Sequence, residues 1–454
     1  MTVRTRSLRA PSLGLLAALI GCMLGAAPMH AATAVPAATA LPAATAVDRS
    51  SYELEATYDV HVDLDWNTRV IDVTTDMQAT NRSLLPISRL ELNTIAARLG
   101  SMRLLEASVD FAPVTPRIDD QTMVIQLPEI LPNTGQISVH TRYRATLRNS
   151  LTSSDWLWSE RDGVASVYRF IPWLSRRTPF NRPNFGDPFV TPVATAVRVR
   201  FTSSVPLVLA TSGVQVANTG PGATFVARNV RDFSFTASPS YRVLTGRSLD
   251  GQTQIRVVTR WASSARARHE LDVARRAIAR YEQWVGRLPY PMVTLAETGA
   301  GTGMESPGLV WISRDPVDLD YLIAHELGHQ WFYGVVGNDE ARDPFFDEAM
   351  TDFLARSFLH QLRGSHCATA PLDRSIYQYS GACYYETIYI QGSLFLDGVR
   401  RQMGSGTFWS TLRAFWASNR YRISRTADLL EAFRAVAGNV LLPSYRAHFP
   451  SLYR

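Results

Sequence analysis

Two histidines four residues apart, His325 and His329, lie in the apolar stretch DYLIAHELGHQWFYG (residues 320–334). On a helix this spacing places both imidazoles on one face, one turn apart, so that they can bind one metal ion. Glu326 lies on the adjacent face, close enough to reach a metal-bound water without being a ligand. This pattern is what a zinc hydrolase needs. The alternatives are a chance match and a metal-free pair of core histidines, which would need partners for two buried rings.

A carboxylate in the next expected helix is the candidate for the third ligand. A catalytic zinc ion usually takes three protein ligands and leaves one position for water. Glu348, in FFDEAMTDF (345–353), follows His329 by 19 positions and has phenylalanine and methionine around it. An acid in so apolar a setting requires a cation. Asp352, one turn further on, is predicted to accept the outer N–H of a ligand imidazole, or alternatively to be a solvated helix acid.

Several blocks in this order resemble the M1 family of zinc aminopeptidases, in the gluzincin clan. The blocks are HELGHQWFYG, the eighteen-residue gap from 330 to 347, and DEA. GTGMESPGLV (301–310) resembles the family's Gly-x-Met-Glu-Asn exopeptidase strand, and YIQG (389–392) resembles its Tyr-x-Lys-Gly block. The combination of blocks is highly specific for this family, whereas any single block except the zinc motif would be weak evidence for it.

The resemblance implies a role for each matching residue. It implies that His325, His329 and Glu348 hold one zinc ion. It implies that Glu326 is the general base, which deprotonates the water and later passes the proton to the leaving amine.

The resemblance also implies how a peptide is held. Glu305 would face the free α-amine, and Gly303 with Met304 and the strand that follows would pair with the substrate backbone as an added strand. Tyr389 would donate its hydroxyl to the oxyanion, a contact commonly worth roughly 3–4 kcal/mol of barrier. Tyr384 is a candidate assistant, with a packed aromatic residue as the alternative.

The chain departs from the family pattern at four points. Ser306 stands where the exopeptidase strand has Asn, Gln391 where the Tyr-x-Lys-Gly block has Lys, and Asp347 where Asn precedes the third ligand. Family members usually carry a large helical C-terminal domain over the cleft. Because this sequence stops at Arg454, we expect that domain to be absent or reduced to a few helices, and the cleft to be more open.

The elements that must position these residues indicate an α+β fold. The alternation of apolar and polar residues in YELEATYDVHVDLDW (52–66) predicts a strand with one solvent-exposed face. Similar short runs with turns between them continue to residue 246. We therefore predict an N-terminal antiparallel β domain over 48–246, preceded by an Ala/Thr/Pro-rich linker over 32–47. Residues 247–454 are expected to form a thermolysin-like α/β zinc catalytic domain with a helical C-terminal part, as the resemblance implies.

Local signals predict the ends of several elements. Residues 263–286 have helical spacing of apolar residues. The histidine helix is expected to be capped by Asp315, another helix to follow Asp343, and a late helix to run from a Thr426 cap to Gly438. The proline-rich segment 169–189 predicts a long loop that reaches a neighbouring site.

Residues 1–31 have the pattern of an export signal. Three arginines precede an apolar run that is short for a membrane span, and small residues follow. We therefore predict a periplasmic or secreted protein with no transmembrane span after cleavage near Ala31. LIGC, which ends at Cys22, resembles the processing box of bacterial lipoproteins, so an outer-membrane lipoprotein anchored at Cys22 is the alternative. The other two cysteines, Cys367 and Cys383, predict a disulfide in an exported protein, with two free buried thiols as the alternative.

Composition excludes some chemistry. The sequence has no lysine, so all 46 basic residues in the Lys+Arg count are arginine, and neither a Schiff-base lysine nor a phosphate-loop lysine is available. The net charge of +6 falls by three when residues 1–31 are removed, and the other arginines are scattered, which argues against nucleic-acid binding.

The leading hypothesis is an exported zinc metallopeptidase that releases N-terminal residues from peptides. The alternatives are an endopeptidase, a zinc hydrolase of another electrophile such as an epoxide, and a non-catalytic zinc-containing peptide-binding protein. Cleavage of N-acetylated peptides and the effect of Glu326→Gln distinguish them.

Overall fold

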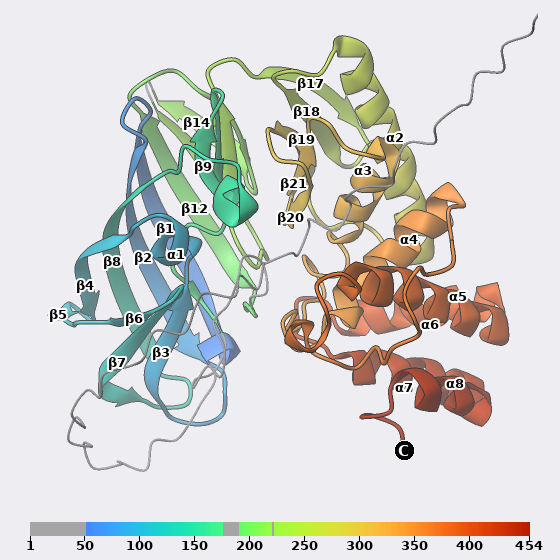
Figure 1. Cartoon of the computed structure of the whole chain (residues 1–454). Helices are drawn as coiled ribbons and strands as arrows, with labels where there is room; N and C mark the ends of the chain where they lie inside the picture. The colour runs from blue at the N-terminus through green and yellow to red at the C-terminus, as the bar shows by residue number, and fades with distance from the viewer. Residues whose placement is uncertain (1–50, 176–189, 220–221) are drawn as a thin grey trace, which may run out of the picture.

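The computed structural model describes residues 51–175, 190–219 and 222–454, which form a β-rich first half and a second half that holds one sheet and most of the helices (Figure 1). The predicted signal, the linker and Cys22 lie outside the described residues, as do positions 176–189 of the predicted proline-rich loop. Within the described ranges, no helix is both long and apolar enough to cross a bilayer. The predicted α+β fold is confirmed.

An eight-stranded sheet dominates the first half, in the order β14-β15-β12-β1-β2-β8-β4-β5. Buried and exposed residues alternate along β1, as the period-two pattern predicts, because one face covers the core. The pairing is antiparallel with one exception, since β1 and β12 run parallel. The strands are β1 (Leu54–Asp65), β2 (Val70–Asn81), β4 (Arg103–Val109), β5 (Ala112–Pro113), β8 (Gln136–Thr146), β12 (Ala194–Ser203), β14 (Val214–Thr219) and β15 (Gly222–Ala227).

Two four-stranded sheets complete the first half, together with the short helix α1 (Ile95–Leu99). β11 lies inside the stretch predicted to be a loop, where Trp173 pairs with Asn93 and stacks on Tyr58 at 4.3 Å between ring centroids. The described part of that stretch is therefore packed into the core. The sheets are β13 (Val208–Thr211), β16 (Phe235–Ser238), β10 (Val164–Val167) and β9 (Trp158–Arg161), and β11 (Trp173–Leu174), β3 (Ile87–Asn93), β7 (Thr122–Leu131) and β6 (Arg117–Asp119).

A five-stranded sheet forms the centre of the second half, in the order β17-β18-β19-β21-β20. β18, β19 and β21 are parallel, and the edge strands β17 and β20 are antiparallel to their neighbours. β17 crosses the predicted boundary at residue 246, so this sheet begins a few residues earlier. The strands are β17 (Arg242–Arg247), β18 (Gln254–Thr259), β19 (Met292–Thr298), β20 (Met304–Ser306) and β21 (Leu309–Ser313).

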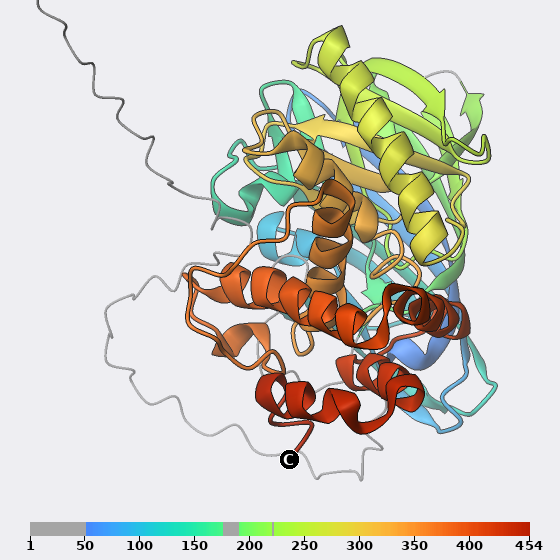
Figure 2. The ribbon, with the colours of Figure 1, turned by 90° about the vertical axis from the view of Figure 1, so that its right-hand side faces the viewer.

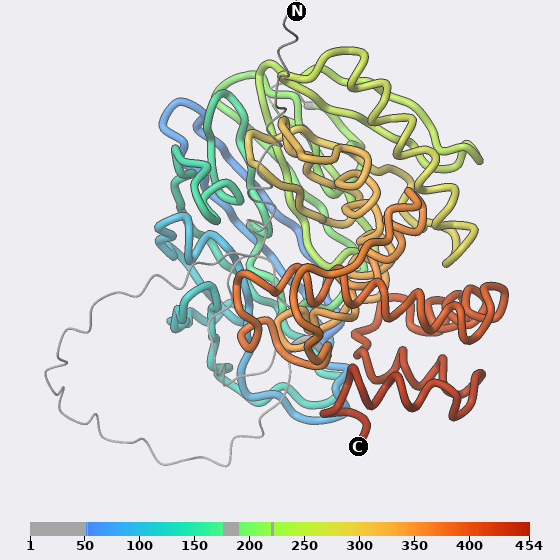
Figure 3. The backbone as a smooth tube through the Cα atoms, turned by 45° about the vertical axis from the view of Figure 1, so that its right-hand side comes forward, coloured from blue at the N-terminus to red at the C-terminus, as the bar shows by residue number. Residues whose placement is uncertain are grey.

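Helices cover one side of this sheet. Figure 2 shows α2 in front of the sheet, and Figure 3 shows α2 and the C-terminal helices at opposite ends of the second half. The predicted helix at 263–286 is confirmed as α2. The helices are α2 (Ser264–Trp284), α3 (Leu319–Gly328), α4 (Met350–Leu359), α5 (Gly392–Met403), α6 (Ser405–Ser418), α7 (Thr426–Ala437) and α8 (Leu442–His448), with π-helical turns η3 (Phe345–Ala349) and η5 (Glu386–Gln391).

Two predicted helix starts are wrong. The side chain of Asp318, not Asp315, accepts the N–H of Tyr321 and caps α3. Thr426 is the first residue of α7 instead of its cap, because its N–H and hydroxyl both donate to Asp343, which is 83 positions away. A carboxylate from a distant segment thus accepts the first N–H of α7, while Asp428 inside the helix accepts the N–H of the N-cap residue Arg425. Gly438 ends α7 with a φ of 72°, as predicted.

Aromatic side chains join the two halves. The ring centroid of Trp311, on β21, lies 5.7 Å from that of Trp156 and 5.7 Å from that of Tyr168, both from the first half. Trp311 is 1% exposed, so one continuous apolar core extends across the junction. The sheet that carries the candidate site is therefore supported from both sides.

Candidate metal centre

Three side-chain atoms from two helical elements converge at one point. The Nε2 atoms of His325 and His329 are 3.2 Å apart, and Oε2 of Glu348 lies 3.3 Å and 3.5 Å from them. A tetrahedral ion with bonds of 2.0–2.1 Å separates its ligands by about 3.3 Å. The three atoms therefore have the spacing of one face of a zinc coordination tetrahedron.

The charges around these atoms favour a cation. Burial lowers the pKa of His325, which keeps this ring neutral and its lone pair available at pH 7. Burial opposes ionisation of Glu348, but its contacts with His325 and His329 outweigh it and hold the pKa well below the usual range. Burial alone would lower the pKa of His329, yet the carboxylates of Glu305, Glu348 and Glu326 raise it. The same negative field that attracts a proton attracts a metal ion, and the donor set fits zinc.

Backbone contacts orient the second histidine. Nδ1 of His329 lies 3.2 Å from the carbonyl oxygen of Phe332. Donation from Nδ1–H to this oxygen fixes the tautomer in which Nε2 carries the lone pair. Gly328 allows the close packing behind it, because a Cβ atom there would lie 3.1 Å from Cβ of Thr351 on α4.

A π-helical turn presents Glu348. Residues Phe345–Ala349 form η3, which runs directly into α4. The N–H of Glu348 donates to Oδ1 of Asp347 at 2.9 Å, and Asn338 donates to the same oxygen at 3.1 Å. Burial and the nearby Glu348 raise the pKa of Asp347. π-helical turns are rare and often occur at functional sites.

The prediction for Asp352 is wrong. Its carboxylate is fully buried but accepts hydrogen bonds from Nε of Arg356 and, at 2.6 Å, from the hydroxyl of Tyr321. In the part of the chain that the structure describes, Nδ1 of His325 has no hydrogen-bond partner. Arg356, four residues further along the helix, is the stronger partner for this acid because the guanidinium is a permanent cation.

The backbone of the glycine-rich turn lies against Glu326. A Cβ atom at Gly303 would lie 2.7 Å from Cδ of Glu326, closer than real contacts allow. Glu326 is 2% exposed. One side of its carboxylate is thus closed by main chain, which restricts the positions that the carboxylate can take.

Glu305 joins the same cluster from β20. Ligand atoms of Glu305, Glu326 and His329 all lie within 4.8 Å of one another. Met304 and Gly303, the other residues predicted to contact a peptide, precede Glu305 on or next to this edge strand. Glu305, which is predicted to bind the amine, and Glu326, which is predicted to be the general base, are therefore neighbours.

The side chain of Gln330 ties this strand to α3. Its Nε2 donates to the carbonyl oxygen of Ser306 at 3.1 Å, and its Oε1 accepts the N–H of Gly308 at 2.8 Å. Gln330 is fully buried and directly follows His329. Sequence reasoning missed this residue, although a glutamine inside an apolar run is itself a signal, because a buried amide needs partners.

Ser306 connects the strand to the first half of the chain. Its hydroxyl donates to Asp232 and lies 2.9 Å from the hydroxyl of Ser212. The other carboxylate oxygen of Asp232 accepts from Tyr333, whose hydroxyl also accepts from Arg169 at 2.7 Å. Asp232 was not predicted, because it is 74 positions from its partner.

Tyr389 lies against a ligand ring. Its ring centroid is 5.5 Å from that of His325, with 24° between the planes, and 4.7 Å from that of Tyr385. The ring centroid of Tyr384, which was predicted to assist Tyr389, lies 6.1 Å from that of Tyr389. Gly392 follows the π turn η5, and a Cβ atom there would lie 2.5 Å from Cβ of Ala349. The two π turns therefore pack directly against each other.

Comparison with known proteins finds similarity in sequence and in fold. No family model matches the chain. Aminopeptidase M1-A of Oryza sativa subsp. japonica is 24% identical over 427 residues, which cover 82% of this chain and 47% of that protein. The chain thus spans about half the length of this curated relative.

Solved structures match over most of their length. A two-domain M1 zinc metallopeptidase in complex with L-arginine has a TM-score of 0.65 and 17% identity, over 85% of this chain and 91% of that one. An M1 zinc metallopeptidase from Deinococcus radiodurans, bound to a Tyr-Ser-Ala substrate, has a TM-score of 0.64 and 17% identity, over 87% and 94%. The chain has the fold of two-domain M1 zinc metallopeptidases, and the predicted resemblance is confirmed at this level.

Proposed function

We propose that this chain is a zinc metallopeptidase that releases residues from the N-terminus of peptides. The observation that carries the proposal is that His329 belongs to two groups of close ligand atoms. One group is completed by His325 and Glu348, the other by Glu305 and Glu326. A metal site, a base and an acid for a free amine therefore meet in one buried place.

His325, His329 and Glu348 would hold one zinc ion. When bound, zinc acidifies a water molecule and polarises the carbonyl of the bond to be cut. With zinc bound, two neutral imidazoles and one carboxylate would leave a net positive charge on the ion and its three ligands, and the carboxylates of Glu305 and Glu326 would lie beside this charge.

Glu326 accepts the proton of the attacking water and passes it to the amine that leaves. It follows His325 in sequence, so it shares the rigid helix α3 with a ligand. The contact with Gly303 holds its carboxylate on the side of the substrate strand.

Tyr389 donates its hydroxyl to the oxyanion that forms as water attacks the carbonyl. A donor of this kind commonly lowers the barrier by roughly 3–4 kcal/mol. Its ring packs against His325 and Tyr385, which limits its motion in the ground state. The hydroxyl is thereby preorganised.

Glu305 binds the α-ammonium group of the peptide. β20 is an edge strand, so a peptide can add to the sheet beside it through main-chain hydrogen bonds. The ammonium then stops at Glu305, and the first peptide bond lies over the metal ligands. An endopeptidase, which cuts within chains, does not need a residue that binds the N-terminal amine.

A panel of fluorogenic aminoacyl amides tests this proposal. Purified protein should cleave free-amine substrates, lose activity with a chelator and recover it with zinc. N-acetylated peptides should be cut at least about tenfold more slowly, because Glu305 loses a charged partner. Equal rates on free and acetylated peptides would favour an endopeptidase or another zinc hydrolase.

The variant Glu326→Gln separates catalysis from binding. It should retain zinc and lose turnover by about 10²–10⁴-fold, the range of general-base contributions. Turnover by metal-replete Glu326→Gln protein would reject the mechanism. A wild-type protein that binds zinc and peptides without cleaving them would support the non-catalytic alternative.

We also propose that the chain is exported, as a periplasmic or secreted protein. The arginine-led apolar segment at 1–31 supports export, and so does the pairing of Cys367 with Cys383, since disulfides persist in oxidising compartments. Mass spectrometry of the mature N-terminus distinguishes cleavage near Ala31 from a lipidated Cys22.

A further inference from the structure

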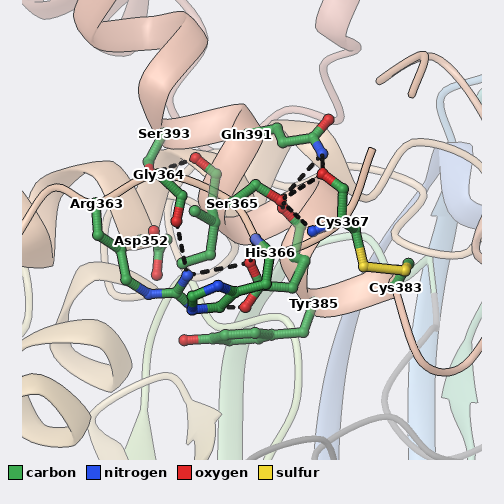
Figure 4. A network of polar contacts seen from close by, with 12 residues as sticks. Asp352, Arg363, Gly364, Ser365, His366, Cys367, Cys383, Tyr385, Gln391 and Ser393 are labelled. Carbon is green, nitrogen blue, oxygen red and sulfur yellow. Dashed lines mark hydrogen bonds and ion pairs between the residues drawn. A yellow bond between two sulfur atoms is a disulfide. The ribbon is translucent and has the colours of Figure 1, made fainter. Parts of the chain in front are cut away.

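Gln391, the last residue of the π turn η5, has several hydrogen-bond partners in one distant segment of the chain. Its amide nitrogen lies within hydrogen-bond distance of Oγ of Ser365 at 3.1 Å and of two carbonyl oxygens, Cys367 at 3.2 Å and Ala368 at 2.9 Å. Its amide oxygen accepts the N–H of Ala370 at 3.1 Å. One side chain, 7% exposed, thus contacts four residues of the segment 363–370, two of which, Ser365 and Cys367, are labelled in Figure 4.

Glu386 holds the other end of the same segment. Both terminal nitrogens of Arg363 donate to its carboxylate, at 3.1 Å and 2.6 Å, and the N–H of His366 donates at 2.8 Å. Cys367 is joined to Cys383, three residues before Glu386, by sulfurs at disulfide distance. Figure 4 shows Arg363 and His366 in one polar network with Ser365, Cys367 and Gln391, with the bond to Cys383 beside it.

Glu386 and Gln391 are the first and last residues of the π turn η5, and Tyr389 lies between them. A π turn accommodates one residue more than an α-helical path and is intrinsically less favourable. Without external support it can relax toward α-helical geometry, which rotates the residues within it relative to α5. Contacts at both ends oppose this relaxation.

We propose that Gln391 is a positioning residue for Tyr389, and that with Glu386 it fastens both ends of η5 to the segment 363–370 so that the hydroxyl of Tyr389 faces the oxyanion. The inference rests on the proposed function and goes beyond it. Gln391 suits this task because a neutral amide offers donors and an acceptor together, whereas lysine offers donors alone.

The substitution Gln391→Met tests the proposal, because methionine has similar length and forms none of these hydrogen bonds. The matched control is Gln402→Met, on the exposed face of α5. kcat and KM are measured with a free-amine amide, and calorimetry gives the Kd of a phosphinic peptide analogue, whose tetrahedral oxygens mimic the oxyanion. Thermal midpoints and zinc content are measured for every variant.

We expect Gln391→Met to lower kcat by at least about tenfold, as small misplacements of catalytic groups do, with unchanged KM and zinc content. The Kd of the phosphinic analogue should rise by a similar factor. Gln402→Met should behave as wild type. The double variant Tyr389→Phe/Gln391→Met should match Tyr389→Phe within about twofold, because Gln391 acts through Tyr389.

The proposal would be overturned if the loss of kcat in the double variant equalled the product of the losses in the two single variants. It would also be overturned if the lower kcat of Gln391→Met were fully explained by lower zinc content or by a smaller fraction of folded protein. Glu386→Gln keeps the side-chain size and provides a second test should Gln391→Met not fold, and normal kcat in a folded Glu386→Gln protein would contradict the inference. If zinc-loaded wild type cleaves no free-amine peptide, the proposed function fails instead.

Discussion

The main chain of Gly303 closes one side of the carboxylate of Glu326, with room for no additional atom between them. This contact links the edge strand that would bind a peptide to the residue that would move protons. A glycine is required here by close approach and not by backbone angle, since Gly303 is not among the glycines with positive φ.

Gly303→Ala should therefore impair catalysis more than stability. The new methyl group must displace the end of a flexible side chain, which costs the fold little but moves the base. We expect kcat to fall by about 10²-fold or more, within the range for general-base catalysis, with a thermal midpoint near that of wild type. Gly301→Ala, where a Cβ atom meets nothing within 4 Å, is the matched control and should retain activity.

Removal of zinc should abolish activity and lower stability together. An ion that binds only the folded state stabilises it by linkage, by about 2.7 kcal/mol when free zinc is at a hundredfold of its Kd. Thermal unfolding with and without a chelator measures the shift. Glu348→Gln protein should show little chelator-dependent shift, and an undiminished shift in this variant would argue that Glu348 is not a ligand.

Gln330→Met should weaken the preference for a free N-terminus. Loss of two hydrogen bonds to Ser306 and Gly308 frees β20, and with it Glu305, while zinc binding persists. We expect the ratio of rates on free and acetylated peptides to fall several-fold, mainly through KM of the free peptide. The exposed Gln283→Met is the control. An unchanged ratio in folded Gln330→Met protein would show that the two hydrogen bonds of Gln330 are not needed to hold β20 in position.

Replacement of Cys367 and Cys383 by serine should destabilise the protein. A cross-link that closes a loop of this size contributes roughly 2–4 kcal/mol by restricting the unfolded chain. Chemical denaturation of the double variant and wild type measures the difference. Peptide mapping without reductant shows whether the two cysteines are joined, and equal stabilities would indicate that they are free thiols in solution.

Local patterns in the sequence were enough for much of the fold. The alternation in β1 and the helical spacing of α2 are short-range signals, and the structure reproduces both. The four-residue spacing of His325 and His329 likewise fixes their common face before any tertiary contact forms.

Residues with distant partners were beyond local reasoning. Asp352 bonds to Arg356 and Tyr321 instead of a histidine ring, and Asp343 caps a helix far along the chain. Asp232 reaches Ser306 across the junction between the halves. Each choice depends on which competing cation or N–H the fold brings nearest, and local patterns in the sequence do not show which one that is.

The two π turns have a consequence for how the chain tolerates insertions and deletions. Deleting a single residue from η3 would let it continue as an ordinary α-helix, and each residue of an α-helix turns by about 100°. Glu348 would then point away from the histidines with its identity unchanged. The number of residues in Phe345–Ala349 therefore sets the direction of a metal ligand, and we expect a one-residue deletion there to remove zinc binding even though all three ligands are retained.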